Sequence, residues 1–348
     1  MKNKLALLGV VALLGVAIAL IIWHGPDWHA VHDAFTAVSW SWVFVAVALN
    51  FLSILLRTVA WDTAIKQSVA PPTPSFSLVF SAFSVGLFAN AVLPGRVGEL
   101  ARVAVLRRRM PGRKGVTATL IGSVFAHRMF DLFPAIALVI WVLLAAKIPG
   151  WAFTSLAVVL VVGTLLFLGS VFIARRQHRD AEGLGRIRLL IARARQGLAV
   201  MRAWLPALKA GSFQVFGWTC QLFAVYAAMY AFQIHEPLAA AGLVLVLMNV
   251  ATIFPIWPGN VGLVQIAVAT PLVGYGVAYA HGIAFGIGLQ AIEASVGIGI
   301  GMLFLAREGI SYAMLKQFEE DAEDETRDRE AVEIPVVEPE RERARSAG

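Results

Sequence analysis

The chain is a series of long apolar runs separated by short polar segments. Runs of this length can cross a lipid bilayer as helices. The pattern predicts about six full spans, which we place at residues 5–23, 40–61, 117–146, 151–173, 211–232 and 282–305. Two further apolar segments, residues 76–106 and 238–277, are each interrupted by a Pro-Gly pair, which breaks a helix. We expect these two to form broken-helix hairpins in an all-α polytopic integral membrane protein.

The two interrupted segments carry the same short motif. Pro94-Gly-Arg-Val-Gly98 and Pro258-Gly-Asn-Val-Gly262 both read P-G-x-V-G, and they begin 164 residues apart. Each copy follows a long apolar run and precedes another predicted span. We therefore predict two repeat halves, at about residues 40–146 and 211–305, each consisting of a span, a hairpin and a second span.

Basic residues in the loops predict how the halves are oriented, because Lys and Arg gather on the cytoplasmic side of a membrane. Lys66 precedes the first hairpin and Arg107-Arg-Arg109 follows it, so this hairpin should enter and leave from the cytoplasm. The loop at His235-Glu-Pro237 has no Lys or Arg, whereas Arg307 follows the last span. The second hairpin should therefore be re-entrant from outside, giving an inverted repeat, and both termini should be cytoplasmic. Inverted repeats with broken helices are typical of transporters.

Two segments lie outside this pattern. Residues 184–205 place apolar residues three and four apart with arginines between them, which predicts an amphipathic helix at the inner headgroup level. A coiled-coil seam with a partner is the alternative. We assign residues 1–306 to the transmembrane domain and 307–348 to a tail. Residues 308–348 carry 13 acidic and 6 basic residues with few large apolar ones, so we expect that tail to be largely disordered.

Composition excludes several other classes of protein. A hydrophobic content of 59% and a mean hydropathy of +0.74 do not fit two soluble domains. The pI is about 9.8, but the basic residues lie in short loops between spans, so we expect no nucleic-acid binding. The single cysteine, Cys220, allows no internal disulfide. His24, His29 and His32 share one loop and suggest a zinc site, but nothing fixes their geometry, so we predict neither metal nor other cofactor.

The first Pro-Gly motif places charged residues at membrane depth. A helix restarting at about Arg96 would carry Arg96, Glu99 and Arg102 on one face. Each charge at the bilayer centre costs about 2.5–3.5 kcal/mol on insertion scales, so these residues should pair or line a wet cavity. The N–H groups of the helix start and the Arg96 guanidinium predict a site for a lipid phosphate. The alternative is that Pro94-Gly95 only turns the chain and Arg96 forms a structural pair with Glu99.

The second motif offers the same backbone geometry with Asn260 in place of the arginine. The predicted headgroup-binding residues from both motifs are Asn90, Pro94, Gly95, Arg96, Gly98, Glu99, Arg102, Pro258, Gly259, Asn260 and Gly262.

Four more ionisable residues lie within predicted spans and are candidates for gating or for structural ion pairs. Arg128 and Asp131 are three apart on one helix face, and His127 is their neighbour. Glu293 is expected either to partner an arginine across the repeat interface or to accept a proton. We find no Gly-x-Ser-x-Gly sequence, clustered metal ligands or Walker loop, so no catalytic residue is predicted.

The motif at residues 90–102, Ala126-His-Arg-Met-Phe-Asp-Leu132 and Pro258-Gly-Asn-Val-Gly262 together resemble the lysylphosphatidylglycerol synthase transmembrane-region family. That family includes the flippase half of the multiple-peptide-resistance proteins, which moves aminoacylated phosphatidylglycerol between leaflets. The resemblance covers about residues 1–306. The family usually has Glu-Arg where this chain has His127-Arg128, and commonly a glutamate where Gln265 stands. Only an acidic tail follows Arg307, so we expect no aminoacyl-transferase domain.

The resemblance implies a lipid flippase-like transporter of a bacterial inner membrane, acting on a phospholipid or lipid-linked headgroup. Membrane lipids are the expected ligands, and a lipid synthase or a second copy of the chain is the candidate protein partner. The alternatives are a membrane enzyme acting on lipid-linked substrates and a non-transporting subunit of an envelope-lipid pathway.

Overall fold

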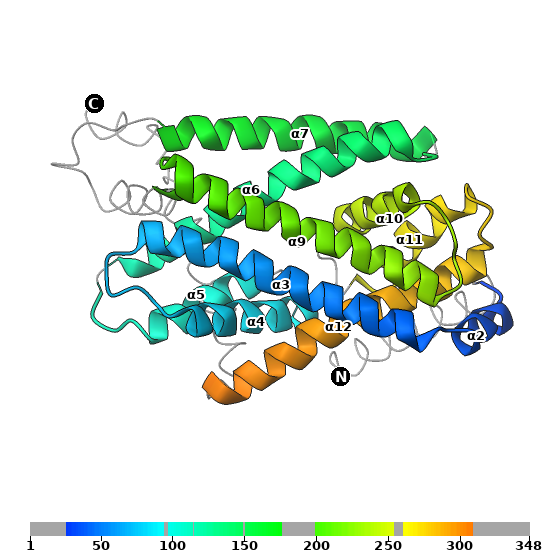
Figure 1. Cartoon of the computed structure of the whole chain (residues 1–348), viewed down its shortest axis with the longest axis horizontal. Helices are drawn as coiled ribbons and strands as arrows, with labels where there is room; N and C mark the ends of the chain where they lie inside the picture. The colour runs from blue at the N-terminus through cyan, green and yellow to red at the C-terminus, as the bar shows by residue number, and fades with distance from the viewer. Residues whose placement is uncertain are drawn as a thin grey trace, which may run out of the picture.

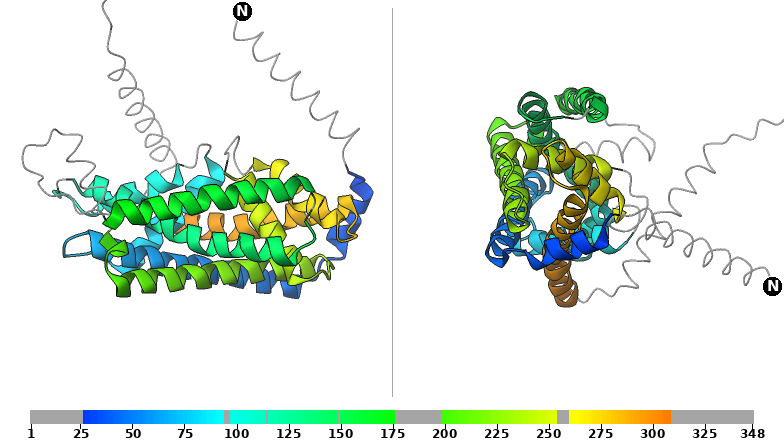
Figure 2. Two further views of the ribbon diagram at one scale, coloured as in Figure 1. Left: turned by 90° about the horizontal axis from the view of Figure 1, so that it is seen from above. Right: turned by 90° about the vertical axis from the view of Figure 1, so that its right-hand side faces the viewer.

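The computed structural model describes residues 26–93, 97–113, 115–148, 150–175, 199–253 and 260–308, which contain helices and no β-strand. The first five helices are α2 (Trp28–Thr36), α3 (Trp40–Ser68), α4 (Phe76–Val92), α5 (Gly98–Arg108) and α6 (Val116–Ala145). The rest are α7 (Gly150–Arg175), η1 (Ala199–Met201), α9 (Trp204–Ala231), α10 (Leu238–Ala251), α11 (Leu263–Val273) and α12 (Tyr279–Glu308). The long helices run lengthwise beside one another, and α7 lies at the periphery, where it packs on α6 and η1 (Figures 1 and 2).

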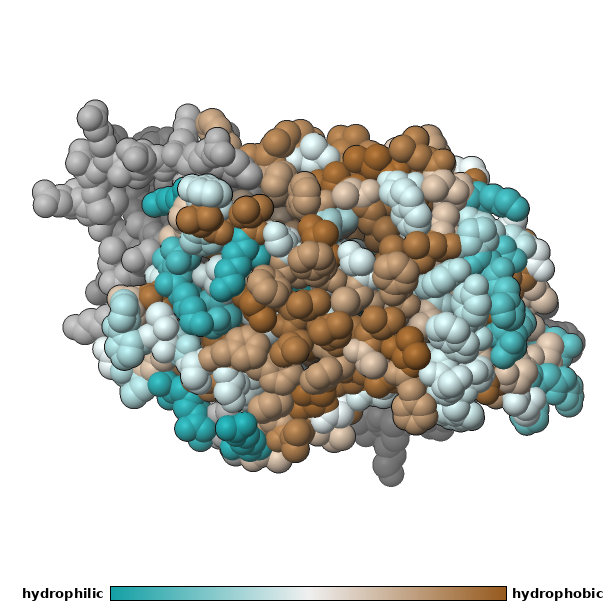
Figure 3. Space-filling view, in the orientation of Figure 1, coloured by the Kyte–Doolittle hydropathy of each residue, from teal (hydrophilic) through white to brown (hydrophobic). Residues whose placement is uncertain are grey.

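The molecule has the surface of a membrane protein. Among the described residues, the helices α3, α6 and α12 are long and apolar enough to cross a bilayer, and α4, α10 and α11 are shorter apolar helices. An apolar band crosses the middle of the face in Figure 3, between more hydrophilic ends. The long helices lie along the same direction, so their ends reach the two polar regions. These observations confirm an all-α membrane protein. The predicted span at residues 5–23 and the tail lie outside the described residues.

Both interrupted segments fold as pairs of shorter helices. The helix α4 packs against α5, and α10 packs against α11. The first pair lies toward one end of the molecule and the second pair toward the other (Figure 1). The connections that hold the Pro-Gly pairs, residues 94–96 and 254–259, lie outside the described residues.

The helix boundaries repeat along the chain. A shift of 164 residues carries the first residues of α3, α4, α5 and α6 to within two residues of the starts of α9, α10, α11 and α12. The packing repeats as well: α4 contacts α12 while α10 contacts α6, and α3 contacts α6 while α9 contacts α12. The two leading helices, α3 and α9, pack directly on each other.

Close packing of α3 on α9 depends on a glycine. The Ser53 hydroxyl donates a 2.7 Å hydrogen bond to the carbonyl oxygen of Gly217, and these residues are 164 apart in the chain. A Cβ on Gly217 would lie 2.6 Å from Cγ of Arg57. The absence of a side chain at this position therefore lets the two helices approach, and it sets where the Arg57 stem lies.

Two element predictions need correction. The helix predicted to end at residue 61 continues to Ser68, and Lys66 forms a 2.6 Å ion pair with Asp62 one turn earlier. The amphipathic helix predicted over residues 184–205 is wrong at its C-terminal end, because η1 covers residues 199–201 and α9 starts at Trp204. Residues 184–198 lie outside the described part of the chain.

The predicted outer loop contains a short helix. Asp27 caps α2, and its Oδ1 accepts hydrogen bonds from the backbone N–H groups of His29 and Ala30. Nδ1 of His32 lies 3.5 Å from Oδ1 of its neighbour Asp33, and no group of three metal-ligating side chains occurs within the described ranges. His24 lies outside those ranges.

Candidate functional site

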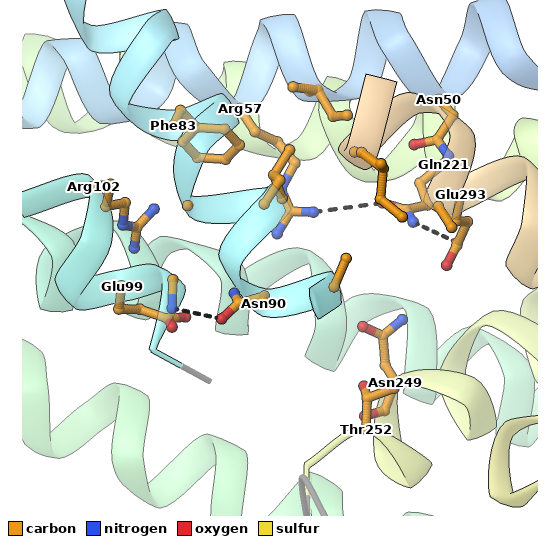
Figure 4. A pocket seen from close by; sticks show the side chains of 18 of the residues that line it. Asn50, Arg57, Phe83, Asn90, Glu99, Arg102, Gln221, Asn249, Thr252 and Glu293 are labelled. Atoms are coloured by element: carbon orange, nitrogen blue, oxygen red, sulfur yellow. Dashed lines mark hydrogen bonds between the residues drawn. The ribbon is translucent and has the colours of Figure 1, made fainter. Parts of the chain in front are cut away.

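A cavity of about 390 Å³ lies between the two halves of the molecule, and both polar and apolar side chains line it. Its volume falls in the range of about 300–1,000 Å³ that is typical of small-molecule sites. Helices from both halves of the molecule contribute residues to its wall (Figure 4). The polar and charged side chains that line it are Asn50, Arg57, Asn90, Glu99, Arg102, His127, Arg128, Gln221, Asn249, Thr252, Asn260, Gln290 and Glu293.

Asp131 lies behind the cavity wall and connects three helices. Its Oδ1 accepts 2.9 Å hydrogen bonds from Nη2 of Arg57 on α3 and from Nε1 of Trp218 on α9. The Nε2 atom of Gln214 also donates to the same oxygen. Asp131 lies on α6, and its hydrogen-bond partners lie on α3 and α9. This buried carboxylate therefore links three packed helices, which favours a structural role over a gating role.

Arg128 joins this network to the half-helix α5. Its Nη2 pairs with Oε1 of Glu99, and its Nη1 lies 3.5 Å from Oδ2 of Asp131. The predicted pair of Arg128 with Asp131 is therefore present, but the closer partner of Arg128 is Glu99. The second carboxylate oxygen of Glu99 is buried without a hydrogen-bond partner among the described residues.

Arg102 differs from the other two arginines of the cavity. It is 5% exposed, and in the described part of the chain it forms neither an ion pair nor a hydrogen bond; Nε and Nη2 are buried without partners. Its guanidinium carbon lies 4.8 Å from the ring centroid of Trp61 and 5.6 Å from that of Phe83. Cation–π contacts hold the cation in place while leaving its N–H groups for another acceptor. A buried arginine with unused donors, facing a cavity, is suited to bind an anion.

Glu293 lies across the cavity from Arg102 (Figure 4). Its Oε1 accepts a 3.0 Å hydrogen bond from Nε2 of Gln221, whose Oε1 lies 3.5 Å from Nη1 of Arg57. We expected this carboxylate either to pair with an arginine or to accept a proton. Its hydrogen-bond partner within the described ranges is the amide of Gln221, and the proton-accepting role stays a prediction. One wall of the cavity therefore has a buried cation without an ion-pair partner among the described residues, and the opposite wall has a carboxylate bound by an amide.

The starts of the two half-helices do not leave all their N–H groups open, contrary to our expectation. The N–H of Gly98 donates a 2.8 Å hydrogen bond to Oδ1 of Asn90, and the N–H of Gly262 donates to Oε1 of Gln265. These glycines are equivalent in the two motifs, and a side-chain amide occupies each donor. An added Cβ on Gly98 would lie 2.0 Å from the carbonyl oxygen of Gly86, so this glycine also allows α5 to pack on α4.

The predicted site residues are therefore only partly assembled at this cavity. Those that line it are Asn90, Gly98, Glu99, Arg102, His127, Arg128, Asn260 and Glu293. Asp131 and Gly262 lie outside the lining. Pro94, Gly95, Arg96, Pro258 and Gly259 lie outside the described residues, so the predicted phosphate contact of Arg96 stays a prediction. His127 is 2% exposed, and its Nδ1 has no partner among the described residues.

Several residues that line the cavity, or that bind Asp131 behind its wall, were not predicted from the sequence. They are Asn50, Arg57, Gln214, Trp218, Gln221, Asn249, Thr252 and Gln290. Most are neutral polar residues within long apolar helices, which hydropathy alone does not distinguish from incidental ones. The 164-residue shift was the available signal, because it pairs Arg57 with Gln221 and Asn50 with Gln214.

A comparison with known protein families supports the resemblance stated above. Residues 6–301 match the family described as the lysylphosphatidylglycerol synthase transmembrane region. The chain belongs to this family. No curated protein matches the chain, and no solved structure does. Membership in the lysylphosphatidylglycerol synthase transmembrane-region family, together with the apolar helices, indicates a membrane protein with a lipid-related function.

Proposed function

We propose that this protein is a flippase-like transporter that moves a phospholipid or lipid-linked headgroup between the leaflets of a bacterial inner membrane. The observation that carries the proposal is Arg102, a buried cation that has no ion-pair partner among the described residues and lines a cavity surrounded by apolar helices. Burial of an unpaired charge is costly unless a ligand supplies the missing partner. A lipid phosphate has the matching charge and geometry, and in a membrane it is present at high local concentration.

An inverted repeat would give this cavity access to both sides of the membrane. The shared helix boundaries, the reciprocal packing of the helices and the opposite placement of the two hairpins all favour such a repeat. In transporters built this way, the substrate site lies near the midplane between the halves, and rocking of one half opens it to each side in turn. The α3–α9 contact at Ser53 and Gly217 joins equivalent positions, so it would lie close to the axis that relates the halves.

Transport can be tested directly in liposomes. The purified protein would be reconstituted with a trace of fluorescent phospholipid, and dithionite quenching would report the fraction of label in the outer leaflet. We expect accelerated exchange between leaflets with the unchanged protein. Arg102→Gln should abolish most of that acceleration, and Arg102→Lys should restore it partly, because an ammonium keeps the charge but loses the two-pronged geometry.

The matched control is Arg108→Gln, which removes an exposed arginine from the same helix. It should transport as well as the unchanged protein does. Full activity of Arg102→Gln would contradict the proposed role of Arg102. Chemical conversion of the lipid by the purified protein alone would support an enzyme instead.

The inverted orientation has its own test. On a Cys220→Ser background, single cysteines at Lys66 and Arg109 should label only from the cytoplasm, and cysteines at Glu236 and Tyr279 only from outside. If Lys66 and Arg109 report opposite faces, the first hairpin is a full crossing and the inverted-repeat proposal fails.

A further inference from the structure

The cavity wall opposite Arg102 consists largely of neutral amide and hydroxyl groups. Its members from the described residues are Asn50, Gln221, Asn249, Thr252 and Gln290, with the carboxylate of Glu293 among them. Figure 4 shows Arg102 and Glu99 toward one side of the cavity, and Gln221, Glu293, Asn249 and Thr252 toward the other. A ligand whose phosphate binds Arg102 would therefore place the rest of its headgroup against this amide wall.

Two members of the amide wall have hydrogen-bonding capacity that the described residues leave unused. Asn50 is 6% exposed and lines the cavity, and its side chain has no hydrogen-bond partner within the described ranges. Asn249 donates 2.8 Å from Nδ2 to the carbonyl oxygen of Leu245 in its own helix, which leaves Oδ1 as an acceptor facing the cavity (Figure 4). Buried polar groups are normally satisfied, so the buried Asn50 amide indicates that a polar ligand completes it. Asn249 is exposed, and its Oδ1 acceptor at the same cavity is available to that ligand.

The kind of unused group selects the chemistry of that ligand. The Asn50 amide offers two N–H donors and a carbonyl acceptor, and Asn249 offers a carbonyl acceptor. A hydroxyl group both donates and accepts, so a set of hydroxyls can satisfy donors and acceptors together. An ammonium group has no lone pair and would leave the N–H groups of Asn50 unmatched. The carboxylate of Glu293 can also accept from hydroxyls, since a single amide donor from Gln221 leaves it with acceptor capacity.

We infer that the headgroup carried by this protein is an uncharged polyol or sugar joined to the lipid through a phosphodiester. The phosphate would contact Arg102, and the hydroxyls would contact Asn50, Asn249 and Glu293. This inference rests on the proposed function, because it takes the bound phosphate as the fixed end of the ligand.

The test compares the binding of four lipids with identical acyl chains to the full-length protein in nanodiscs. Phosphatidylinositol and phosphatidylglycerol carry polyols, phosphatidylethanolamine carries an ammonium, and phosphatidic acid has only the phosphate. Binding would be measured by native mass spectrometry, with the four lipids in competition. We expect the two polyol lipids to bind about tenfold more tightly than the other two, which corresponds to about 1.4 kcal/mol.

Variants of the amide wall separate the polyol contact from the phosphate contact. Asn50→Leu and Asn249→Leu should each reduce the preference for the polyol lipids severalfold and leave the affinity for phosphatidic acid unchanged. Thr219→Val is the control, because Thr219 is exposed on α9 and, among the described residues, its hydroxyl bonds to the carbonyl oxygen of Val215 in its own helix alone. If Asn50→Leu does not fold, Asn249→Leu and the ranking of the four lipids on the unchanged protein still decide the question.

The outcomes distinguish this inference from the proposed function. Equal binding of all four lipids, lost in Arg102→Gln, would overturn the polyol inference and leave the phosphate site standing. Tightest binding of phosphatidylethanolamine would overturn it in favour of an ammonium at Glu293. If no lipid binds, or if Arg102→Gln binds all of them normally, both the inference and the proposed function fail.

Discussion

The two halves of this protein share their helix order but not their charges. The positions equivalent to Glu99, Arg102 and Arg128 in the second half, 164 residues further on, are Leu263, Ile266 and Ile292. Near the contact between the halves, Arg57 corresponds to Gln221, and these two side chains meet at 3.5 Å. The helix boundaries therefore repeat along the chain, while the charged residues at equivalent positions do not.

If the proposed function is correct, this difference means that each half binds a different part of the lipid headgroup. The first half supplies the three arginines of the cavity, and two of them are occupied by Glu99 and Asp131. The second half supplies most of the amides and the carboxylate of Glu293. A site built in this way has a defined direction, with the phosphate toward the first half and the remainder of the headgroup toward the second.

The largest expected effect comes from breaking the ionic network of the first half. Asp131→Leu would leave Arg57 without its ion-pair partner and Arg128 with only Glu99 among the described residues. Loss of one partner of a buried pair costs about 3–5 kcal/mol, so the free energy of unfolding should fall by about that amount. Denaturant titration in detergent would measure it. The control is Ser295→Ala, at the equivalent position of the second half, which should cost less than about 1.5 kcal/mol. Similar losses of unfolding free energy in both variants would contradict the proposed difference between the two halves, in which the first half alone depends on an ionic network.

A smaller effect should follow from wedging the two halves apart. Gly217→Ala places a Cβ 2.6 Å from Cγ of Arg57, and overpacking of this kind costs about 1–3 kcal/mol. The same substitution at Gly299 meets no atom within 4 Å, so there it should leave stability unchanged or raise it by about 0.4–1 kcal/mol. Thermal unfolding of the two variants would compare them. A neutral Gly217→Ala would show that the halves are not tightly packed at this contact.

The smallest effect is expected in the second half. Gln221→Leu removes the hydrogen bond to the Glu293 carboxylate and the long contact with Arg57, and a bond to a charged group contributes about 1.5–3 kcal/mol. We expect a loss near the lower end, about 1.5 kcal/mol in the free energy of unfolding, measured under the same conditions. A loss as large as that of Asp131→Leu would mean that Gln221 belongs to the structural network rather than to the cavity wall.

The sequence was sufficient to predict the long apolar helices, because apolar runs and Pro-Gly breaks are local signals, but it did not predict the short helix α2 or the start of α9 at Trp204. The P-G-x-V-G motif also predicted the 164-residue shift between the halves. The sequence could not predict which charged residues form ion pairs, because partners such as Arg128 and Glu99 come from different helices and meet only through packing. For the same reason, the hydrogen bond that Oδ1 of Asn90 accepts from the N–H of Gly98 was not predicted, and the role of Asn90 as a headgroup ligand stays a prediction.

The most direct test of the central claim is the melting temperature of the Arg102→Gln variant with and without added phospholipid. If Arg102 is reserved for a phosphate, the lipid-free variant should melt at the same temperature as the unchanged protein or higher, because a buried unpaired charge has been removed. Phospholipid should stabilise the unchanged protein, and binding to the variant should be about 10- to 100-fold weaker, since a charge-assisted hydrogen bond contributes about 1.5–3 kcal/mol. A lipid-free variant that melts well below the unchanged protein, yet is stabilised normally by phospholipid, would show that Arg102 is a structural residue and would contradict the account.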